Sequence, residues 1–129
     1  MEQLRRAVRS AVVWGPFLDE SGAAVGRYRF DEAFVGFQGH FPGRPLLPAV
    51  VQIMAALHVA GEVWKDLSHP PLSVDRAKFT LPVAPGDEVE VRCERKPLRE
   101  GEGIEARLCV QGEAAASFLL IPSFEEEAS

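Results

Sequence analysis

A single histidine is set among three prolines and three glycines in the stretch Gly36-Phe37-Gln38-Gly39-His40-Phe41-Pro42-Gly43-Arg44-Pro45-Leu46-Leu47-Pro48, which leads directly into an apolar segment at residues 49–67. Proline fixes the backbone angle φ at about −65°, and glycine allows φ values that other residues avoid. A loop of this composition holds one unusual shape instead of sampling many. We therefore interpret the stretch as a loop that presents His40 as part of a site.

Residues 49–67 have the composition of a helix buried in a soluble fold. Strong helix formers occupy the middle of the segment: Ala55, Ala56, Leu57 and Ala60. Because almost every position is apolar or small, we expect the rest of the protein to wrap around this helix. A membrane span is not expected, because polar or charged residues lie inside the segment or at its end: His58, Glu62, Lys65 and Asp66.

The few polar side chains of this helix fall along one stripe. At about 100° per residue, the stripe contains Met54, His58, Gly61, Glu62 and Lys65. Residues three and four positions apart are neighbours on a helix surface. His58 and Glu62 are therefore expected on the same side of the helix as Met54.

The remaining segments carry strand signals. Residues 11–14 and 26–30 predict an opening hairpin around the turn at Ser21-Gly22. After the breaker at residues 68–71, strands are predicted at residues 72–79, 89–93, 104–110 and 114–121, with a polar loop at residues 96–103. The fold class that fits this order is α+β, a curved antiparallel sheet wrapped around one long central helix. Such a sheet leaves an edge that dimerisation often covers.

Length and composition indicate one domain. The chain has 129 residues, of which 47% are hydrophobic, which suits a single domain at residues 1–129 with a core at about residues 10–122 and an acidic tail at residues 123–129. The net charge of -5 argues against nucleic acid as a partner. Residues 1–10 are polar and interrupted by arginines, so no secretory leader is expected and the protein is predicted to be cytoplasmic.

No metal is expected from the cysteines and histidines. Cys93 and Cys109 form no Cys-x-x-Cys pair or other metal-ligand spacing, and they are interpreted as reduced core thiols. The three histidines, His40, His58 and His69, lack the spacing of a zinc site.

Two motifs carry a resemblance to a known family. The run Gly39-His40-Phe41-Pro42-Gly43-Arg44-Pro45-Leu46-Leu47-Pro48-Ala49-Val50 resembles the active-site signature of the beta-hydroxyacyl-acyl-carrier-protein dehydratases of the FabA and FabZ type, which have the hotdog fold. A second run, Val74-Asp75-Arg76-Ala77-Lys78-Phe79 with Pro82-Val83-Ala84-Pro85-Gly86-Asp87, is similar to the strand and turn that follow the helix in those enzymes. The resemblance covers residues 26–122 and implies a homodimer or higher homo-oligomer with acyl tunnels at the subunit interface.

The resemblance also implies a reaction and a set of roles. His40 matches the base that takes the proton from C2 of a beta-hydroxyacyl thioester, and the amide of Ala49 matches the donor to the thioester carbonyl. In that family a Glu or Asp on the central helix of the partner subunit protonates the departing hydroxyl. The substrate-binding candidates that follow from the same motif are Phe41, Arg44, Pro48, Ala49, Val50 and Met54. Arg44 is the best candidate for contact with an acidic carrier protein.

The sequence departs from the family at the acid. Counting along the signature places the Glu or Asp at Met54, which cannot donate a proton and is interpreted as a gap-filling core or tunnel residue. His58 follows one turn later, where these enzymes usually carry glutamine, and Glu62 follows one turn after that. One hypothesis is that a protonated His58 held by Glu62 supplies the proton. The structural alternative is a hydrogen-bonded core or interface histidine.

Three functions follow. The first is a dehydratase-like protein acting on beta-hydroxyacyl thioesters of acyl-carrier protein, or of coenzyme A, in fatty-acid or polyketide- or polyene-type synthesis, with no cofactor. The second is a thioesterase that uses the same helix amide with Glu62 as the carboxylate. The third is a non-catalytic acyl-binding subunit of a heteromeric dehydratase, which explains Met54 most simply.

Overall fold

The computed structural model describes residues 2–37, 46–67, 72–99 and 101–122. Within these ranges the helices and strands are α1 Glu2–Ser10, β1 Val12–Leu18, β2 Ala24–Arg29, α2 Ala49–Val63, β3 Leu72–Phe79, β4 Glu88–Leu98, β5 Gly101–Val110 and β6 Glu113–Pro122. Two short 3-10 turns lie before and after α2, η1 Val35–Phe37 and η2 Lys65–Leu67.

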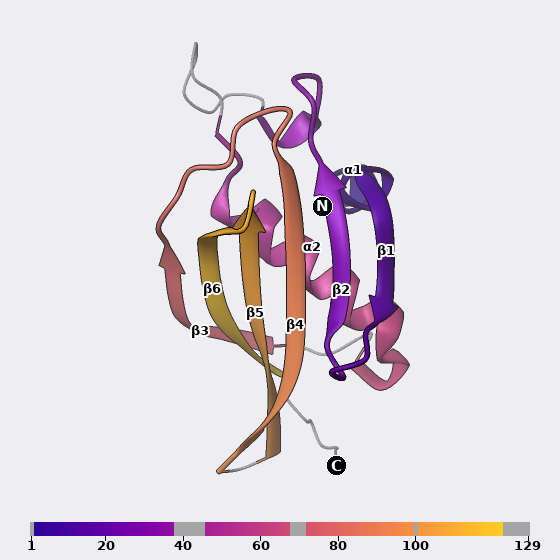
Figure 1. The fold of residues 1–129 in the computed structure, drawn as a ribbon, viewed down its shortest axis with the longest axis vertical. Coiled ribbons are helices and arrows are strands. Elements are labelled where there is room, and N and C mark those ends of the chain that lie inside the picture. The colour runs from indigo at the N-terminus through magenta and orange to yellow at the C-terminus, as the bar shows by residue number, and fades with distance from the viewer. Residues whose placement is uncertain (1, 38–45, 68–71, 100, 123–129) are drawn as a thin grey trace.

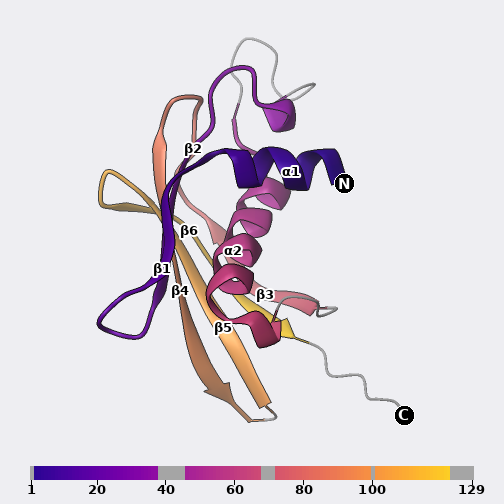
Figure 2. The same cartoon turned by 90° about the vertical axis from the view of Figure 1, so that its right-hand side faces the viewer.

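The six strands form one sheet in the order β1-β2-β4-β5-β6-β3, and every neighbouring pair is antiparallel. In Figure 1 the sheet crosses in front of α2, and in Figure 2 α2 lies along one face of the curved sheet. The prediction of a hotdog arrangement, an antiparallel sheet curved around a central helix, is therefore confirmed. β2 pairs with β4, so two strands that are neighbours in the sheet are separated along the sequence by α2 and β3.

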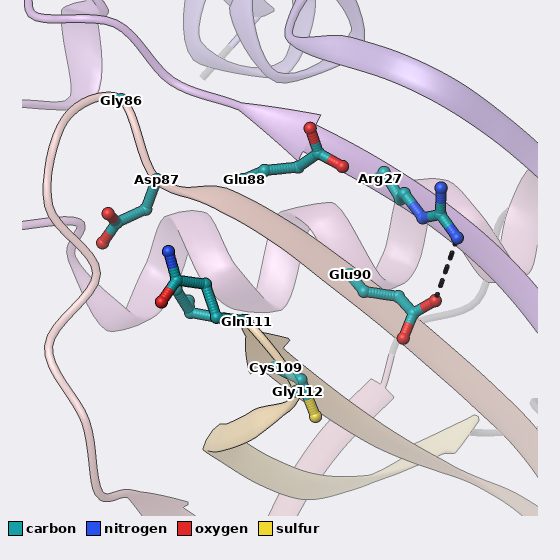
Figure 3. Close-up of a pocket in the computed structure, with 9 residues that line it drawn as sticks. Arg27, Gly86, Asp87, Glu88, Glu90, Cys109, Gln111 and Gly112 are labelled. Atoms are coloured by element: carbon teal, nitrogen blue, oxygen red, sulfur yellow. Dashed lines mark ion pairs between the residues drawn. The ribbon is translucent and has the colours of Figure 1, made fainter.

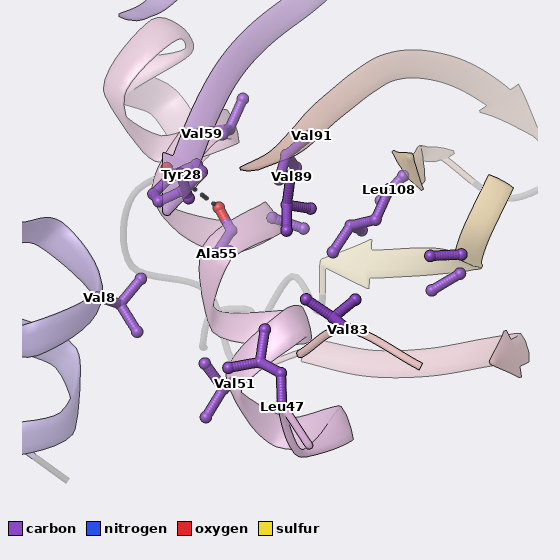
Figure 4. Close-up of a cluster of buried hydrophobic side chains, with 14 of the residues drawn as sticks. Val8, Tyr28, Leu47, Val51, Ala55, Val59, Val83, Val89, Val91 and Leu108 are labelled. Carbon is purple, nitrogen blue, oxygen red and sulfur yellow. Dashed lines mark hydrogen bonds between the residues drawn. The ribbon is translucent and has the colours of Figure 1, made fainter. Parts of the chain in front are cut away.

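The core forms where the alternating strands meet α2. In β4, Val89, Val91 and Cys93 are buried while the residues between them carry charges toward solvent, which is the predicted period of a half-buried strand. Val91 lies opposite Gly26 of β2 and Leu108 of β5. Figure 4 shows Val89, Val91 and Leu108 gathered between the sheet and α2. The central helix is thus held by apolar packing against β2, β4 and β5.

The central helix is shorter than predicted. It begins at Ala49, as expected, but ends at Val63 and not near residue 67. Trp64 has extended backbone, and its N–H donates to Ala60 O at 2.8 Å. Arg95 of β4 accounts for this end, because its guanidinium lies 5.4 Å from the Trp64 ring and 3.0 Å from the Asp66 carboxylate.

The expectation that the whole helix is wrapped is also wrong for this single chain. The sheet buries one face of α2, formed by Val51, Gln52, Ala55, Ala56, Val59 and Ala60. On the opposite side Val50 is 44% exposed, and Ile53, Met54 and Leu57 are half-buried. The reason is geometric, because a sheet that curves along one side of a helix leaves the other side open.

An N-terminal helix was not expected in the polar residues 1–10. In α1, Leu4, Ala7 and Val8 lie three and four positions apart and form an apolar side, and Val8 is only 1% exposed. This side packs against α2 (Figure 2). The spacing was a usable signal, hidden by the arginines on the other side.

The predicted polar loop at residues 96–103 is wrong. β4 and β5 continue through it as a hairpin, with Lys96 opposite Gly103 and Leu98 opposite Gly101. Charged residues hold this extension through ion pairs, such as Lys96 with Glu105 at 3.4 Å. Apolar periodicity is weak in such a hairpin, and the strands therefore resemble a loop in the sequence.

Replacement of Gly15 by alanine is expected to lower the free energy of unfolding by about 3 kcal/mol. Gly15 of β1 has φ +79, and a Cβ there would lie 2.7 Å from the backbone oxygen of Val25. Gly22 is the matched control, because it has φ +93 but a Cβ at that position would meet nothing within 4 Å. We expect Gly22→Ala to cost about 1 kcal/mol. Equal losses for the two variants in urea unfolding would show that the close approach contributes nothing.

Candidate functional site

The predicted site residues divide into two groups. His40, Phe41 and Arg44 lie outside the residues that the structure describes. Pro48, Ala49 and Val50 form the beginning of α2, with Met54, His58 and Glu62 following along it. The described part of the site therefore consists of the helix and the strands that pack against it.

Hydrogen bonds to Leu47, which precedes the helix, fix the start of α2. The N–H of Leu47 donates to Val83 O at 2.8 Å, and the buried Gln52 side chain donates from Nε2 to Leu47 O at 3.1 Å. Gln52 was not singled out as a site residue from the sequence, and its side-chain oxygen Oε1 is buried without a hydrogen-bond partner among the described residues. Gln52 thus anchors the segment that precedes the helix.

The first turn of α2 is open to a ligand oxygen. The N-cap residue, Pro48, offers no side-chain hydrogen bond to the helix, and Ala49 and Val50 are exposed. The first N–H groups of a helix have no partner within it and carry the positive end of the helix dipole. An oxygen that develops negative charge, such as a thioester carbonyl, is stabilised at such a position.

His58 is paired with a tyrosine that the sequence did not indicate. The hydroxyl oxygen of Tyr28, on β2, lies 2.6 Å from Nδ1 of His58, and the two rings meet edge to face with centroids 5.9 Å apart. Tyr28 is completely buried and His58 is half-buried. Figure 4 shows Tyr28 directed at α2, where its hydroxyl also lies 3.5 Å from Ala55 O.

Burial sets the protonation of this pair. Burial lowers the pKa of His58, and the positive charges of Arg9 and Lys65 act in the same direction, while Glu62 opposes them. Burial also raises the pKa of Tyr28 far above its usual range. Burial therefore favours the neutral form of both side chains.

The Glu62 side chain does not lie where the hypothesis of a His58–Glu62 pair requires it. Its side chain is 50% exposed, and its carboxylate lies 3.9 Å from the Lys65 ammonium. Among the described residues, the side chain that hydrogen-bonds His58 is Tyr28. Met54, one turn before His58, is half-buried on the open side of α2.

A surface hollow of about 430 Å³ lies elsewhere, on the face of the sheet away from α2. Figure 3 shows Asp87, Glu88 and Glu90 around it, with Arg27 paired to Glu90 at 3.7 Å. These side chains alternate with the inward-facing residues of the same strands, so the hollow is separated from the start of α2 by the sheet. Two of its carboxylates are paired with arginines, Glu90 with Arg27 and Glu88 with Arg29, and the hollow does not take part in the site on α2.

Neither a metal cluster nor a membrane-spanning helix is present in the described ranges. They contain no group of three or more His, Cys, Asp or Glu side chains that could hold a metal ion. None of their helices is long and apolar enough to cross a membrane.

Comparison with known proteins gives consistent matches. The family model described as ApeI-like, ApeI dehydratase, matches residues 18–117. The 3-hydroxyacyl-[acyl-carrier-protein] dehydratase FabZ of Geotalea uraniireducens is 35% identical in an alignment of 102 positions, and the match covers 71% of this chain and 70% of that protein. The FabZ of Symbiobacterium thermophilum is 34% identical in an alignment of 104 positions, and the match covers 70% of this chain and 72% of that protein.

One solved structure links the fold to the same group. The dehydratase heterocomplex ApeI:P from Xenorhabdus doucetiae matches with a TM-score of 0.64 and 25% sequence identity. The match covers 77% of this chain and 85% of that chain.

Proposed function

The chain belongs to the ApeI-like dehydratase family, and we propose that it removes water from a beta-hydroxyacyl thioester of acyl-carrier protein to give the enoyl thioester. The observation that carries the proposal is the signature at residues 39–50, which leads into a helix whose first turn is open. The FabZ relatives, whose names state 3-hydroxyacyl-acyl-carrier-protein dehydration, support the substrate class. A role in fatty-acid or polyketide- or polyene-type synthesis follows from that class.

In the proposed reaction His40 acts as the base. It takes the proton from C2, the C2 electron pair forms the double bond to C3, and the C3–O bond breaks. The departing oxygen takes that proton back from the His40 imidazolium and leaves as water, which returns His40 to its neutral form. The Ala49 amide donates to the thioester oxygen as negative charge develops there, and the helix dipole adds to this stabilisation. The acyl chain is proposed to lie against Phe41, Pro48, Val50 and Met54, with Arg44 toward the acidic carrier protein.

We propose that the functional unit is a homodimer. Support comes from the open side of α2 and from β3, an edge strand that is exposed along residues 73–79. Val74 and Phe79 of β3 are 38% and 42% exposed. A long exposed edge strand with apolar side chains is usually covered by another chain. The free thiols of Cys93 and Cys109 fit a reducing compartment, and we place the protein in the cytoplasm.

A second candidate is a subunit of a heteromeric dehydratase. Met54 favours this candidate, because it stands where the FabA- and FabZ-type enzymes carry their acid and its side chain cannot donate a proton. The solved structure of ApeI:P is by its description a dehydratase heterocomplex. In this case a partner chain would supply the carboxyl group to the site that contains His40.

The thioesterase alternative has weaker support. It requires a carboxylate or a bound water to attack the carbonyl, and the candidate carboxylate Glu62 is exposed and paired with Lys65. The deciding experiment is mass spectrometry of beta-hydroxyacyl-acyl-carrier protein after incubation with the purified protein. Loss of one water supports the dehydratase, and release of free acid supports the thioesterase. An unchanged substrate, which becomes dehydrated when a second subunit is added, supports the heteromeric enzyme.

Introducing a carboxyl group at Met54 is expected to raise the rate of water removal. Met54→Glu should increase kcat about 10-fold or more, because a positioned general acid contributes on the order of 10²-fold to 10⁴-fold. The matched control is Met54→Leu, which keeps the apolar character and supplies no proton. A Glu variant no faster than the Leu variant would show that position 54 does not face the departing hydroxyl.

A further inference from the structure

Gln52 is a polar residue on the buried face of α2, where the other buried positions are Val or Ala. Its side chain is 4% exposed, and within the described ranges its Nε2 donates to Leu47 O at 3.1 Å while Oε1 is buried without a partner. A buried acceptor without a partner costs free energy, and an apolar side chain would fill the same position without that cost. Packing alone therefore does not explain a glutamine at this position.

The backbone before α2 is held at successive peptide groups, and Gln52 binds two of them. The N–H of Leu47 donates to Val83 O at 2.8 Å, and both residues are labelled in Figure 4. The Gln52 side chain then holds Leu47 O, the carbonyl of the next peptide group. The main-chain N–H of Gln52 donates to Pro48 O at 3.2 Å, and the N–H of Val51 donates to the same oxygen at 3.1 Å. Gln52 thus binds both peptide groups that lead into the first turn.

These contacts set the direction of the Ala49 N–H group. In a trans peptide group the C=O and the following N–H lie in one plane and point in opposite directions. Pro48 O points into the helix, toward the N–H groups of Val51 and Gln52, so the Ala49 N–H points out of the first turn. In the part of the chain that the structure describes, no hydrogen bond uses the N–H of Ala49 or of Val50. The Ala49 N–H is therefore directed outward and open to an acceptor.

We propose that Gln52 is a positioning residue that holds the Ala49 N–H in the direction of the thioester carbonyl. The inference rests on the proposed dehydration and on its Ala49 donor, and it assigns a role to a buried side chain that acts through the backbone. A donor stabilises an oxygen that gains negative charge most effectively when its direction is fixed before the reaction. A displacement of about 1 Å in such a site costs on the order of 10²-fold in rate.

The variant Gln52→Met isolates the contribution of the side-chain amide. Methionine is unbranched and adaptable, so it fills the space of glutamine without supplying a donor. The main-chain hydrogen bond to Pro48 O remains, Leu47 O loses its side-chain partner, and the buried Oε1 is removed. Because these last two changes offset each other, the Tm should stay within about 3 °C of the wild type. Gln52→Leu gives the same comparison if the Met variant does not fold.

The matched control is Val59→Ala, on the same buried face of α2. Val59 is 0% exposed and lies seven residues after Gln52. Its truncation should lower the Tm by about 4 °C or more, because it leaves a cavity between α2 and the sheet. It keeps the hydrogen bond between Gln52 and Leu47, so it reports loss of stability without loss of positioning.

The first test reads the hydrogen bond to the carbonyl without turnover. The probe is hexanoyl-acyl-carrier protein with ¹³C at the thioester carbonyl, which has no C3 hydroxyl and cannot lose water. Infrared difference spectra follow the carbonyl band, whose frequency falls as the hydrogen bond to it strengthens. We expect a lower frequency on binding to the wild type and to Val59→Ala, and a frequency closer to that of the free probe in Gln52→Met. The same band in Gln52→Met as in the wild type overturns the proposal.

The second test reads kcat and KM for water removal. Gln52→Met should lose on the order of 10²-fold in kcat with less than about a threefold change in KM, because the donor acts mainly in the transition state. Val59→Ala should keep a kcat near that of the wild type when it is measured well below its Tm. A Gln52→Met variant with the kcat of the wild type, or one that changes KM alone, overturns the proposal and leaves Gln52 as a packing residue.

The two tests separate this inference from the dehydratase proposal. Water removal by the wild type, with Gln52→Met equal to it in both tests, leaves the dehydratase proposal intact and refutes the role of Gln52. No water removal by the wild type refutes dehydration by the isolated chain, and the carbonyl band still decides whether Gln52 directs the donor. A band that does not move on binding to the wild type refutes both the Ala49 donor and its positioning.

Discussion

Replacing His40 by alanine is expected to lower kcat for water removal by about 10³-fold. The reason is chemical, because in the proposed reaction this imidazole takes the C2 proton and returns it to the departing oxygen, and alanine can do neither. The measurement is the amount of enoyl thioester formed from beta-hydroxyacyl-acyl-carrier protein, followed by mass spectrometry.

The control for this variant is another histidine of the chain. His69 follows the predicted helix in the breaker at residues 68–71 and belongs to no motif of the site. His69→Ala should keep the activity of the wild type. If His40→Ala retained full turnover while substrate binding stayed unchanged, His40 could not be the base, and the signature would mark a binding loop only.

Truncation of Leu108 is expected to have the largest effect on stability. Leu108 of β5 has 0% of its surface exposed and lies between Val91 of β4 and Ala116 of β6. Leu108→Ala should lower the free energy of unfolding by about 2–5 kcal/mol, because it removes buried methyl groups and leaves a cavity beneath α2. Urea unfolding at one fixed protein concentration measures the loss, since association also contributes to apparent stability.

Leu18 supplies the matched substitution on the surface. It lies at the end of β1 with 57% of its surface exposed. The same change, Leu18→Ala, should cost less than about 1 kcal/mol. A comparable loss at both positions would mean that Leu18 is covered by another chain in solution, or that Leu108 is not central to the core.

Local periodicity was sufficient to predict most of the sheet. Val89, Val91 and Cys93 alternate with charged residues, and this pattern alone indicated both the strand and its buried face. The beginning of α2 at Ala49 followed from Pro48 and the run of helix formers. These features depend on neighbours in sequence, which is why they could be predicted.

Two features that the sequence did not predict depend on contacts between residues far apart in the chain. The end of α2 is set by Arg95, which lies 29 residues after Asp66 in the chain. The partner of His58 is Tyr28, 30 residues before it, and nothing in the spacing of the helix indicates a tyrosine on β2. The apolar side of α1 was visible in the sequence but short, since it comprises Leu4, Ala7 and Val8.

The pairing of β2 with β4 has a consequence for folding. Arg29 and Glu88 are hydrogen-bonded partners 59 residues apart, so the whole segment with the signature and α2 is a loop that this pairing must close. β3, inside that loop, pairs with β6, the last strand of the sheet. Closure of long loops costs chain entropy before the contacts that it permits are gained, and such topologies fold slowly. During synthesis on the ribosome, β3 therefore remains without its neighbour in the sheet until β6 has emerged.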